Sequence, residues 1–214
     1  MLIAISAYRW GVSLAAWIAP APFLLVMRRA DRWRLRLLVL AVVTIASIVQ
    51  VGKIITAPLP WAMAIPFALP SAVSAWLVLL GTETARRRAG ELAGLATFVA
   101  LAGLGEWMTF AYSPLGVWGT AASTQVDNLA LLQLASVTGV AGIGMVVALV
   151  PATIAMLVGA PATRPRVRAA LAAAAVVGAV HAWGAVRLFA HPGGPTVRVA
   201  AVLVASLRPG LPGA

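Results

Sequence analysis

Six long apolar segments, separated by short connections, constrain this chain more than any other feature of its sequence. They cover residues 10–27, 37–57, 61–80, 92–112, 129–158 and 169–189. Each is long enough to cross a hydrocarbon core of about 30 Å, for which a helix needs about 20 residues. A helix satisfies its own backbone hydrogen bonds in lipid, and these runs lack the alternation of barrel strands. The sequence therefore predicts an all-α polytopic membrane protein with about six transmembrane helices.

The composition excludes several classes of protein. Hydrophobic residues make up 62% of the chain and charged residues 10%, against about 45–50% and about 25% in soluble domains. A net charge of +11 would indicate a nucleic-acid partner in a soluble protein. Here the basic residues cluster between apolar runs, where they contact lipid headgroups, so we expect a phospholipid bilayer as partner and no nucleic acid. The absence of cysteine excludes disulfide scaffolds and cysteine-ligated metals.

The basic residues also predict the orientation of the chain in a membrane. Two connections, 57–60 and 113–128, contain none of them. The intervening, alternate connections hold most of the arginines: Arg28, Arg29, Arg32, Arg34, Arg36, Arg86, Arg87, Arg88, Arg164, Arg166 and Arg168. By the positive-inside rule these connections face the cytoplasm. We therefore expect a multi-pass protein of the plasma (inner) membrane, with its N-terminus and its C-terminus on the outer face.

The end of the chain differs from the rest. Residues 191–195 are a glycine and proline cluster that breaks regular structure, and residues 196–204 are a β-branched run typical of a strand. A lone strand is not stable. We therefore expect a transmembrane helical domain over residues 1–190, followed at 191–214 by a linker and the first strand of another domain.

Glu106 is the acidic residue that stands out, because it lies inside the fourth apolar segment, near its outer end. An ionisable group within a span costs a few kcal/mol and marks a functional or pairing site. Lys53 lies near the outer end of its own segment and is the candidate for a structural ion pair with Glu106. The alternative is that Glu106 takes part directly in a substrate groove.

The histidines do not indicate a metal site. His181 and His191 are the only two, and no carboxylate lies near either of them in sequence. Two isolated ligands cannot complete a coordination shell. We therefore expect no metal and no cofactor.

The connection 113–128 carries the strongest motif signal. It is long for a helical hairpin and rich in turn residues, and Trp118 lies between two glycines within it. Tryptophans near the outer boundary fit an interfacial aromatic belt, but a belt explains a tryptophan within a loop less well. The loop around Trp118 is therefore the most informative part of the sequence.

These residues, taken together, resemble a known family. The motifs are Glu106-Trp107, Ser113-Pro114-Leu115-Gly116, Trp118-Gly119, Thr124-Gln125, Asp127-Asn128, Leu132-Gln133-Leu134-Ala135-Ser136, Thr138-Gly139 and Gly142-Ile143, with a weaker match at Trp17-Ile18-Ala19-Pro20 and Phe23-Leu24-Leu25. They resemble the membrane domain of the apolipoprotein N-acyltransferases, and the strand near 197–202 resembles the start of that family's nitrilase-like domain.

The resemblance implies a function. In the family, a Glu-Lys-Cys triad in the nitrilase-like domain takes an acyl chain from phospholipid as a thioester and passes it to the amino terminus of a lipoprotein. The membrane bundle lets the lipid chains reach that triad. Glu106, Trp118, Thr124 and Gln125 would line the lipid-access groove.

This chain contains no cysteine, and an activated thiolate is the nucleophile of that chemistry. We therefore expect no catalytic residue and no acyl transfer from this chain alone, with a lipoprotein or a separately encoded catalytic domain as possible partners. The alternative is a non-catalytic membrane scaffold or anchor for a partner enzyme.

Overall fold

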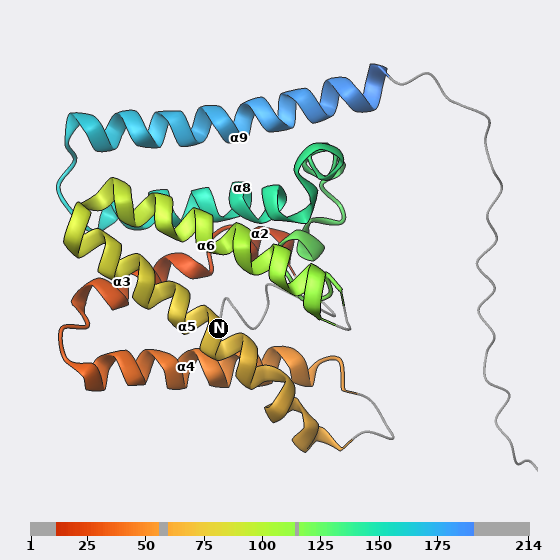
Figure 1. Ribbon diagram of the computed structural model, residues 1–214. Coiled ribbons are helices and arrows are strands. Elements are labelled where there is room, and N and C mark those ends of the chain that lie inside the picture. The colour runs from red at the N-terminus through yellow and green to blue at the C-terminus, as the bar shows by residue number, and fades with distance from the viewer. Residues whose placement is uncertain (1–11, 56–59, 114–115, 191–214) are drawn as a thin grey trace, which may run out of the picture.

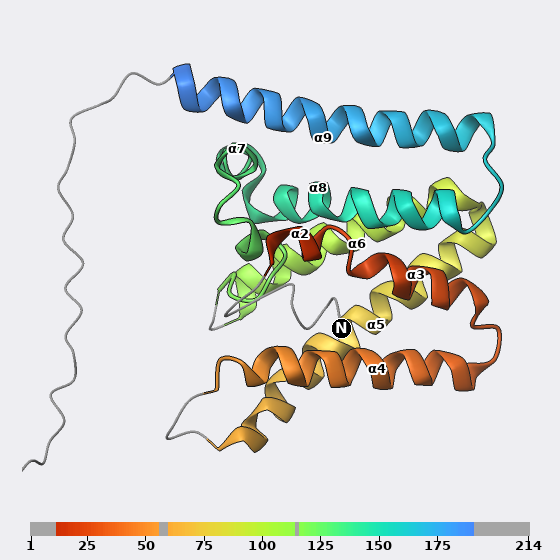
Figure 2. The same ribbon diagram turned by 180° about the vertical axis from the view of Figure 1, so that it is seen from behind.

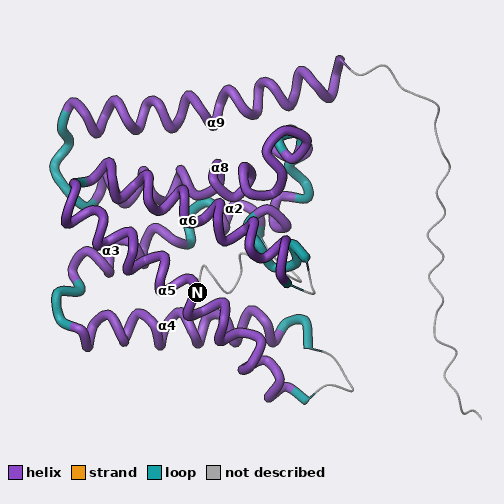
Figure 3. The backbone as a smooth tube through the Cα atoms, in the orientation of Figure 1, coloured by secondary structure: helices purple, strands orange, loops and turns teal. Residues whose placement is uncertain are grey.

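The computed structural model describes residues 12–55, 60–113 and 116–190 of the chain, and these residues are helical with no strand among them. Figure 3 shows the helices and their connections. In chain order the elements are α2 (Ser13–Ala16), α3 (Pro20–Arg29), α4 (Trp33–Gly52), the 3₁₀ turn η1 (Trp61–Met63), α5 (Ala64–Ala89), α6 (Glu91–Tyr112), the 3₁₀ turn η2 (Ala122–Gln125), α7 (Leu129–Leu132), α8 (Ala135–Val158) and α9 (Arg164–Ala190).

Five helices within these ranges are long and apolar enough to cross a membrane. They are α4, α5 with its leading 3₁₀ turn, α6, α8 and α9, and they coincide with five of the six predicted segments. The prediction of an all-α polytopic membrane protein is confirmed. The linker and strand predicted for 191–214 lie outside the described residues.

The first predicted segment, 10–27, is not one continuous span. Within its described part the chain forms α2, turns at residues 17–19 and begins again as α3. Pro20 opens α3 and Pro22 follows in the same turn. Proline has no backbone N–H, so it begins a helix readily but cannot continue the hydrogen bonding of a preceding one. The apolar run therefore holds two short helices.

The fifth predicted segment, 129–158, is also divided. The short helix α7 ends at Leu132, and the chain turns at residues 133–134 before α8 begins. A second interruption lies inside α8 at Gly139, whose φ of 64° and ψ of −162° are not helical. A positive φ is readily available to glycine. Apolar character alone predicted a single helix here and missed both breaks.

α8 lies at the centre of the bundle, packed against α3, α6 and α9. Half of the most apolar stretch of α8 is buried, whereas 11% of the corresponding stretch of α9 is buried. Figures 1 and 2 show α4 and α9 at opposite edges of the molecule. The main buried cluster joins α3, α4, α5, α6 and α8 at the centre, through Leu24, Val43, Leu79, Phe98 and Ala152.

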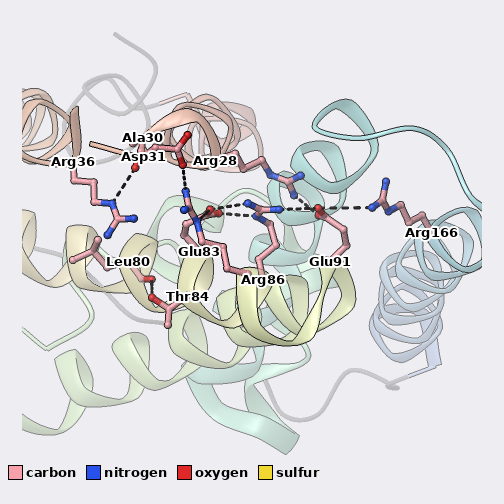
Figure 4. A network of polar contacts seen from close by, with 11 residues as sticks. Arg28, Ala30, Asp31, Arg36, Leu80, Glu83, Thr84, Arg86, Glu91 and Arg166 are labelled. Atoms are coloured by element: carbon pink, nitrogen blue, oxygen red, sulfur yellow. Dashed lines mark hydrogen bonds and ion pairs between the residues drawn. The ribbon is translucent and has the colours of Figure 1, made fainter. Parts of the chain in front are cut away.

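All three arginine-rich connections meet at one end of this bundle, which we call the arginine end (residues 28–36, 83–91 and 161–168). Glu91 Oε2 accepts a hydrogen bond from Arg28 Nη2 at 2.7 Å, and its Oε1 accepts one from Arg86 Nη1 at 3.2 Å. Arg166 Nη2 lies 3.8 Å from Glu91 Oε1. One carboxylate therefore joins α3, α5 and α9 to the start of α6, as Figure 4 shows.

A second carboxylate extends the same network. The Arg86 side chain donates two hydrogen bonds to Glu83, one to each carboxylate oxygen and each 2.7 Å long. Arg87 donates to Glu83 Oε1 at 2.5 Å and to Asp31 Oδ1 at 2.7 Å. The Arg87–Asp31 pair ties α5 to the connection between α3 and α4. The arginine connections therefore share one end, as the charge pattern predicts.

We predict that Glu91→Ala destabilises the protein by about 3 kcal/mol, because removing one partner of a buried ion pair leaves the other charges uncompensated. The Glu91 side chain is 11% exposed and contacts three arginines. Thermal unfolding in detergent micelles, followed by circular dichroism, measures the loss.

Asp31→Ala is the matched control. It removes an acidic partner from the same network, but its side chain is 77% exposed, so we expect a loss below about 1 kcal/mol. Equal losses from the two variants would contradict a buried network centred on Glu91.

Candidate functional site

The connection from α6 to α8 forms a compact cap at the end of the bundle opposite the arginines, visible on the right of Figure 1. We call this cap the polar loop (residues 116–134). It contains η2 and α7, and its turns use Gly116 and Gly119, with φ of 58° and 84°. Left-handed values of this kind favour glycine. The two glycines that flank Trp118 therefore set the path of the chain.

Glu106 fixes the polar loop to the bundle. Its side chain is buried, and Oε1 accepts a hydrogen bond from the backbone N–H of Ala121 at 2.7 Å. Gly144 of α8 leaves the room for it, because a Cβ there would lie 2.3 Å from Glu106 Cγ. The carboxyl group thus satisfies a loop N–H that otherwise has no helical partner. Its role in this geometry is to position the loop.

Lys53 is the residue considered from the sequence as the ion-pair partner of Glu106. The described salt bridges do not join the two residues, and Oε2 of Glu106 has no hydrogen-bond partner within the described ranges. Lys53 directly follows α4. The contacts of Glu106 that the structure describes lead to the polar loop, and its ion pair with Lys53 stays a prediction.

Gln125 is the second anchor, and among the described polar residues it is the most deeply buried, at 1% exposure. Its Oε1 accepts from Trp17 Nε1 at 2.9 Å, and its Nε2 donates to the backbone oxygen of Ser13 at 3.2 Å and to Thr124 Oγ1 at 2.8 Å. These contacts tie the polar loop to α2 and to the turn that follows it. Both ends of the Gln125 amide are therefore paired.

Thr124 and Trp118 have different surroundings. The Thr124 hydroxyl donates to the backbone oxygen of Ala121 at 2.7 Å while it accepts from Gln125, so it supports the anchor. Trp118 is half-exposed on the loop, as Trp107 is at the end of α6, and Tyr112 is exposed beside Trp107. The side chains of Glu106, Thr124 and Gln125 thus form the hydrogen bonds that hold the polar loop, and Trp118 lies on the surface of the loop.

Sequence reasoning missed a third anchor, between Asn128 and His181. Asn128 Oδ1 accepts from the backbone N–H of Leu131 and caps α7, while its Nδ2 donates to His181 Nε2 at 3.0 Å. His181 Nδ1 lies 2.8 Å from the backbone oxygen of Val177, which requires the proton on Nδ1. The capping asparagine before an apolar run was the available signal.

The same contact brings α9 close to α7. A Cβ on Gly184 would lie 1.9 Å from the backbone oxygen of Ala130, so only a glycine allows this approach. Arg187 Nη1 adds a hydrogen bond to Ser136 Oγ at 2.5 Å. The end of α9 is therefore held by the polar loop, although most of the helix is exposed.

The arrangement is suited to positioning the polar loop on the bundle. Two buried side chains, Glu106 and Gln125, and the partly buried Asn128 fasten the polar loop to apolar helices, and the loop carries a half-exposed tryptophan at its surface. The described residues contain no group of three or more histidines or acidic residues that could hold a metal ion. Such a loop can shape the boundary that a lipid chain meets.

Residues 1–153 match the model of the apolipoprotein N-acyltransferase N-terminal domain. That range includes α2 to α7, the polar loop and most of α8. No curated protein and no solved structure matches the chain significantly.

We predict that Glu106→Ala destabilises the protein by about 1–3 kcal/mol, the cost of leaving a buried donor unsatisfied, and makes the polar loop more sensitive to protease. Glu106→Gln keeps an oxygen for the N–H of Ala121 and is expected to lose less than half as much. Thermal unfolding and limited proteolysis in micelles measure both effects. An alanine variant as stable as the glutamine variant would contradict the anchoring role.

We predict opposite results for two glycines of α9. Gly184→Ala is expected to destabilise by about 1–3 kcal/mol, because its methyl group would overlap the backbone of α7. At Gly178 a Cβ meets nothing within 4 Å, so Gly178→Ala should be neutral or slightly stabilising. Thermal unfolding of the two variants gives the comparison, and equal effects would contradict the close contact of α9 with α7.

Proposed function

We propose, for a chain that belongs to the apolipoprotein N-acyltransferase family, that its bundle is a membrane domain that presents phospholipid acyl chains for transfer to a lipoprotein. The observation that carries the proposal is the anchored polar loop. Buried Glu106 and Gln125 hold it at one end of an apolar bundle, with Trp118 exposed on it. The family match covers this loop.

The proposed orientation follows from charge. The arginine end would face the cytoplasm and the polar loop would lie at the outer face of the plasma membrane. The N-terminus would be outside, and the C-terminal end of α9 would emerge beside the polar loop. A catalytic domain that follows α9 would then stand above the loop.

The chemistry of the proposed reaction needs a nucleophile. An acyl chain leaves its glycerol oxygen to form a thioester on a cysteine, and the lipoprotein's amino group then attacks the thioester and releases the thiolate. This chain contains no cysteine. We therefore assign the Glu-Lys-Cys triad to a nitrilase-like domain, on a further segment or on a separate chain. The reaction uses no cofactor, metal or nucleic acid.

Within this proposal the four groove residues divide into two roles. Glu106, Thr124 and Gln125 are positioning residues, because their contacts hold the loop. Trp118 is the contact residue, because its ring is exposed at the boundary where acyl chains would leave the bilayer.

The alternative is a membrane scaffold that anchors a partner enzyme. The exposed face of α9 favours it, because large apolar residues such as Leu171 and Val186 extend along a helix that packs only lightly on the bundle. A scaffold would bind its partner stably and would tolerate changes to the polar loop.

The test joins this bundle to a complete nitrilase-like domain and measures acyl transfer from phospholipid to a diacylglyceryl-cysteine peptide. We predict transfer by the joined protein and none by the 214-residue chain alone. Trp118→Ala is expected to reduce kcat/KM by about tenfold, since burial of a large apolar side chain is worth about 1.5–3 kcal/mol.

Leu171→Ala is the control, because it removes another exposed apolar side chain far from the loop along α9. Unchanged transfer in the Trp118 variant would remove the loop from the mechanism. A folded joined protein that transfers nothing but retains a partner enzyme would favour the scaffold.

A further inference from the structure

The arginine end carries more positive charge than its own acidic residues neutralise. Asp31, Glu83 and Glu91 are paired with Arg28, Arg86, Arg87 and Arg166. Among the described residues, six exposed arginines at this end form no salt bridge with an acidic residue: Arg29, Arg32, Arg34, Arg88, Arg164 and Arg168. This end therefore has a surface suited to anions.

Three of the six arginines lie close together in sequence, at the turn from α3 to α4. Arg29 ends α3, Arg32 precedes α4, and Arg34 lies in the first turn of α4. Arg36 is less available to a ligand than these three, because its Nε already donates a hydrogen bond to the backbone oxygen of Ala30 at 3.0 Å. That bond fixes the turn that carries the other three.

Trp33 lies between two of these arginines and is 65% exposed. The Cζ atom of Arg34 lies 6.0 Å from the centre of the Trp33 ring, within the range of a cation–π contact. Tryptophan prefers the headgroup level of a bilayer. The indole therefore places this corner of the protein at the depth of lipid phosphates.

An apolar stripe begins directly below this corner. It consists of exposed side chains spaced alternately three and four residues apart along one face of α4: Leu35, Leu38, Val42, Ile45 and Val49. From Leu35 to Val49 a helix rises about 21 Å, which is more than one leaflet of a hydrocarbon core of about 30 Å. Among the described helices α4 packs on α5 and α3, so the stripe is open to lipid.

We propose that this corner binds one anionic phospholipid, with the phosphate held by Arg29, Arg32 and Arg34 and an acyl chain lying along the stripe of α4. Guanidinium groups suit this ligand because they pair with phosphate through two hydrogen bonds. The site is at the opposite end from the polar loop. It is independent of the proposed acyl transfer and would serve to anchor α4, which lies at the edge of the bundle (Figure 2).

The stripe distinguishes a lipid from free phosphate as the occupant. Arg164 and Arg168 of α9 are also exposed. The corner at the start of α4 differs from them because Trp33 lies between its exposed arginines, Arg32 and Arg34. Inorganic phosphate would use the guanidinium groups alone. A phospholipid would contact the guanidinium groups with its phosphate and the apolar stripe of α4 with an acyl chain.

The experiment is native mass spectrometry of the purified full chain in detergent micelles. The protein is incubated with equal amounts of phosphatidylglycerol and phosphatidylcholine, with or without inorganic phosphate. We expect one phosphatidylglycerol to be retained at least tenfold better than phosphatidylcholine, since each basic side chain contributes about 1 kcal/mol of attraction to anionic lipid. We expect inorganic phosphate at the lipid's concentration not to displace it.

The variant R32Q/R34Q should reduce phosphatidylglycerol retention about tenfold or more. The matched control R164Q/R168Q removes the same charge from the same end and should retain the lipid. Circular dichroism checks that both variants fold as the wild type does.

Equal loss in the two variants would overturn the site, since it would show attraction to bulk charge only. Equal retention of the two lipids by the wild type would also overturn it, and this readout needs no variant. Displacement by inorganic phosphate would overturn the role of the stripe.

Discussion

The ion-pair network around Glu91 and Glu83 is the interaction on which the rest of the structure depends. Charged groups at a bundle end are costly to bury unless they are paired, and here two carboxylates join arginines from three connections that are far apart in sequence. The network joins α3, α5, α6 and α9 at this end, as Figure 4 shows. Because the helix ends at this side are fixed, the opposite ends also come together.

Hydrogen bonds of the polar loop organise the opposite end of the bundle. Gln125 connects the polar loop to α2, Glu106 connects it to α6, and Asn128 connects it to α9. A loop held from three sides presents a fixed surface at the membrane boundary. The two ends of the bundle therefore differ. Ion pairs hold the helices together at the arginine end, and the polar loop forms the face above which a catalytic domain is proposed.

The sequence predicts the parts of this fold that depend on one helix at a time. Five of the six segments predicted from hydropathy contain the long helices that the structure describes, and arginine placement identifies the end they share. The breaks near Pro20, Leu132 and Gly139 were missed, because an apolar run looks alike whether it is one helix or two. The partner of Glu106 was also missed, since a backbone N–H fifteen residues away leaves no mark in side-chain composition.

We propose that the polar loop and the arginine end lie on opposite sides of the plasma membrane. The chain has no cysteine, so single cysteines report position without background. Val126→Cys lies in the polar loop and Thr163→Cys at the arginine end, both at exposed positions. A membrane-impermeant thiol reagent added to intact spheroplasts should label the Val126 variant at once and the Thr163 variant only after permeabilisation. Labelling of both variants from the outside would contradict the account.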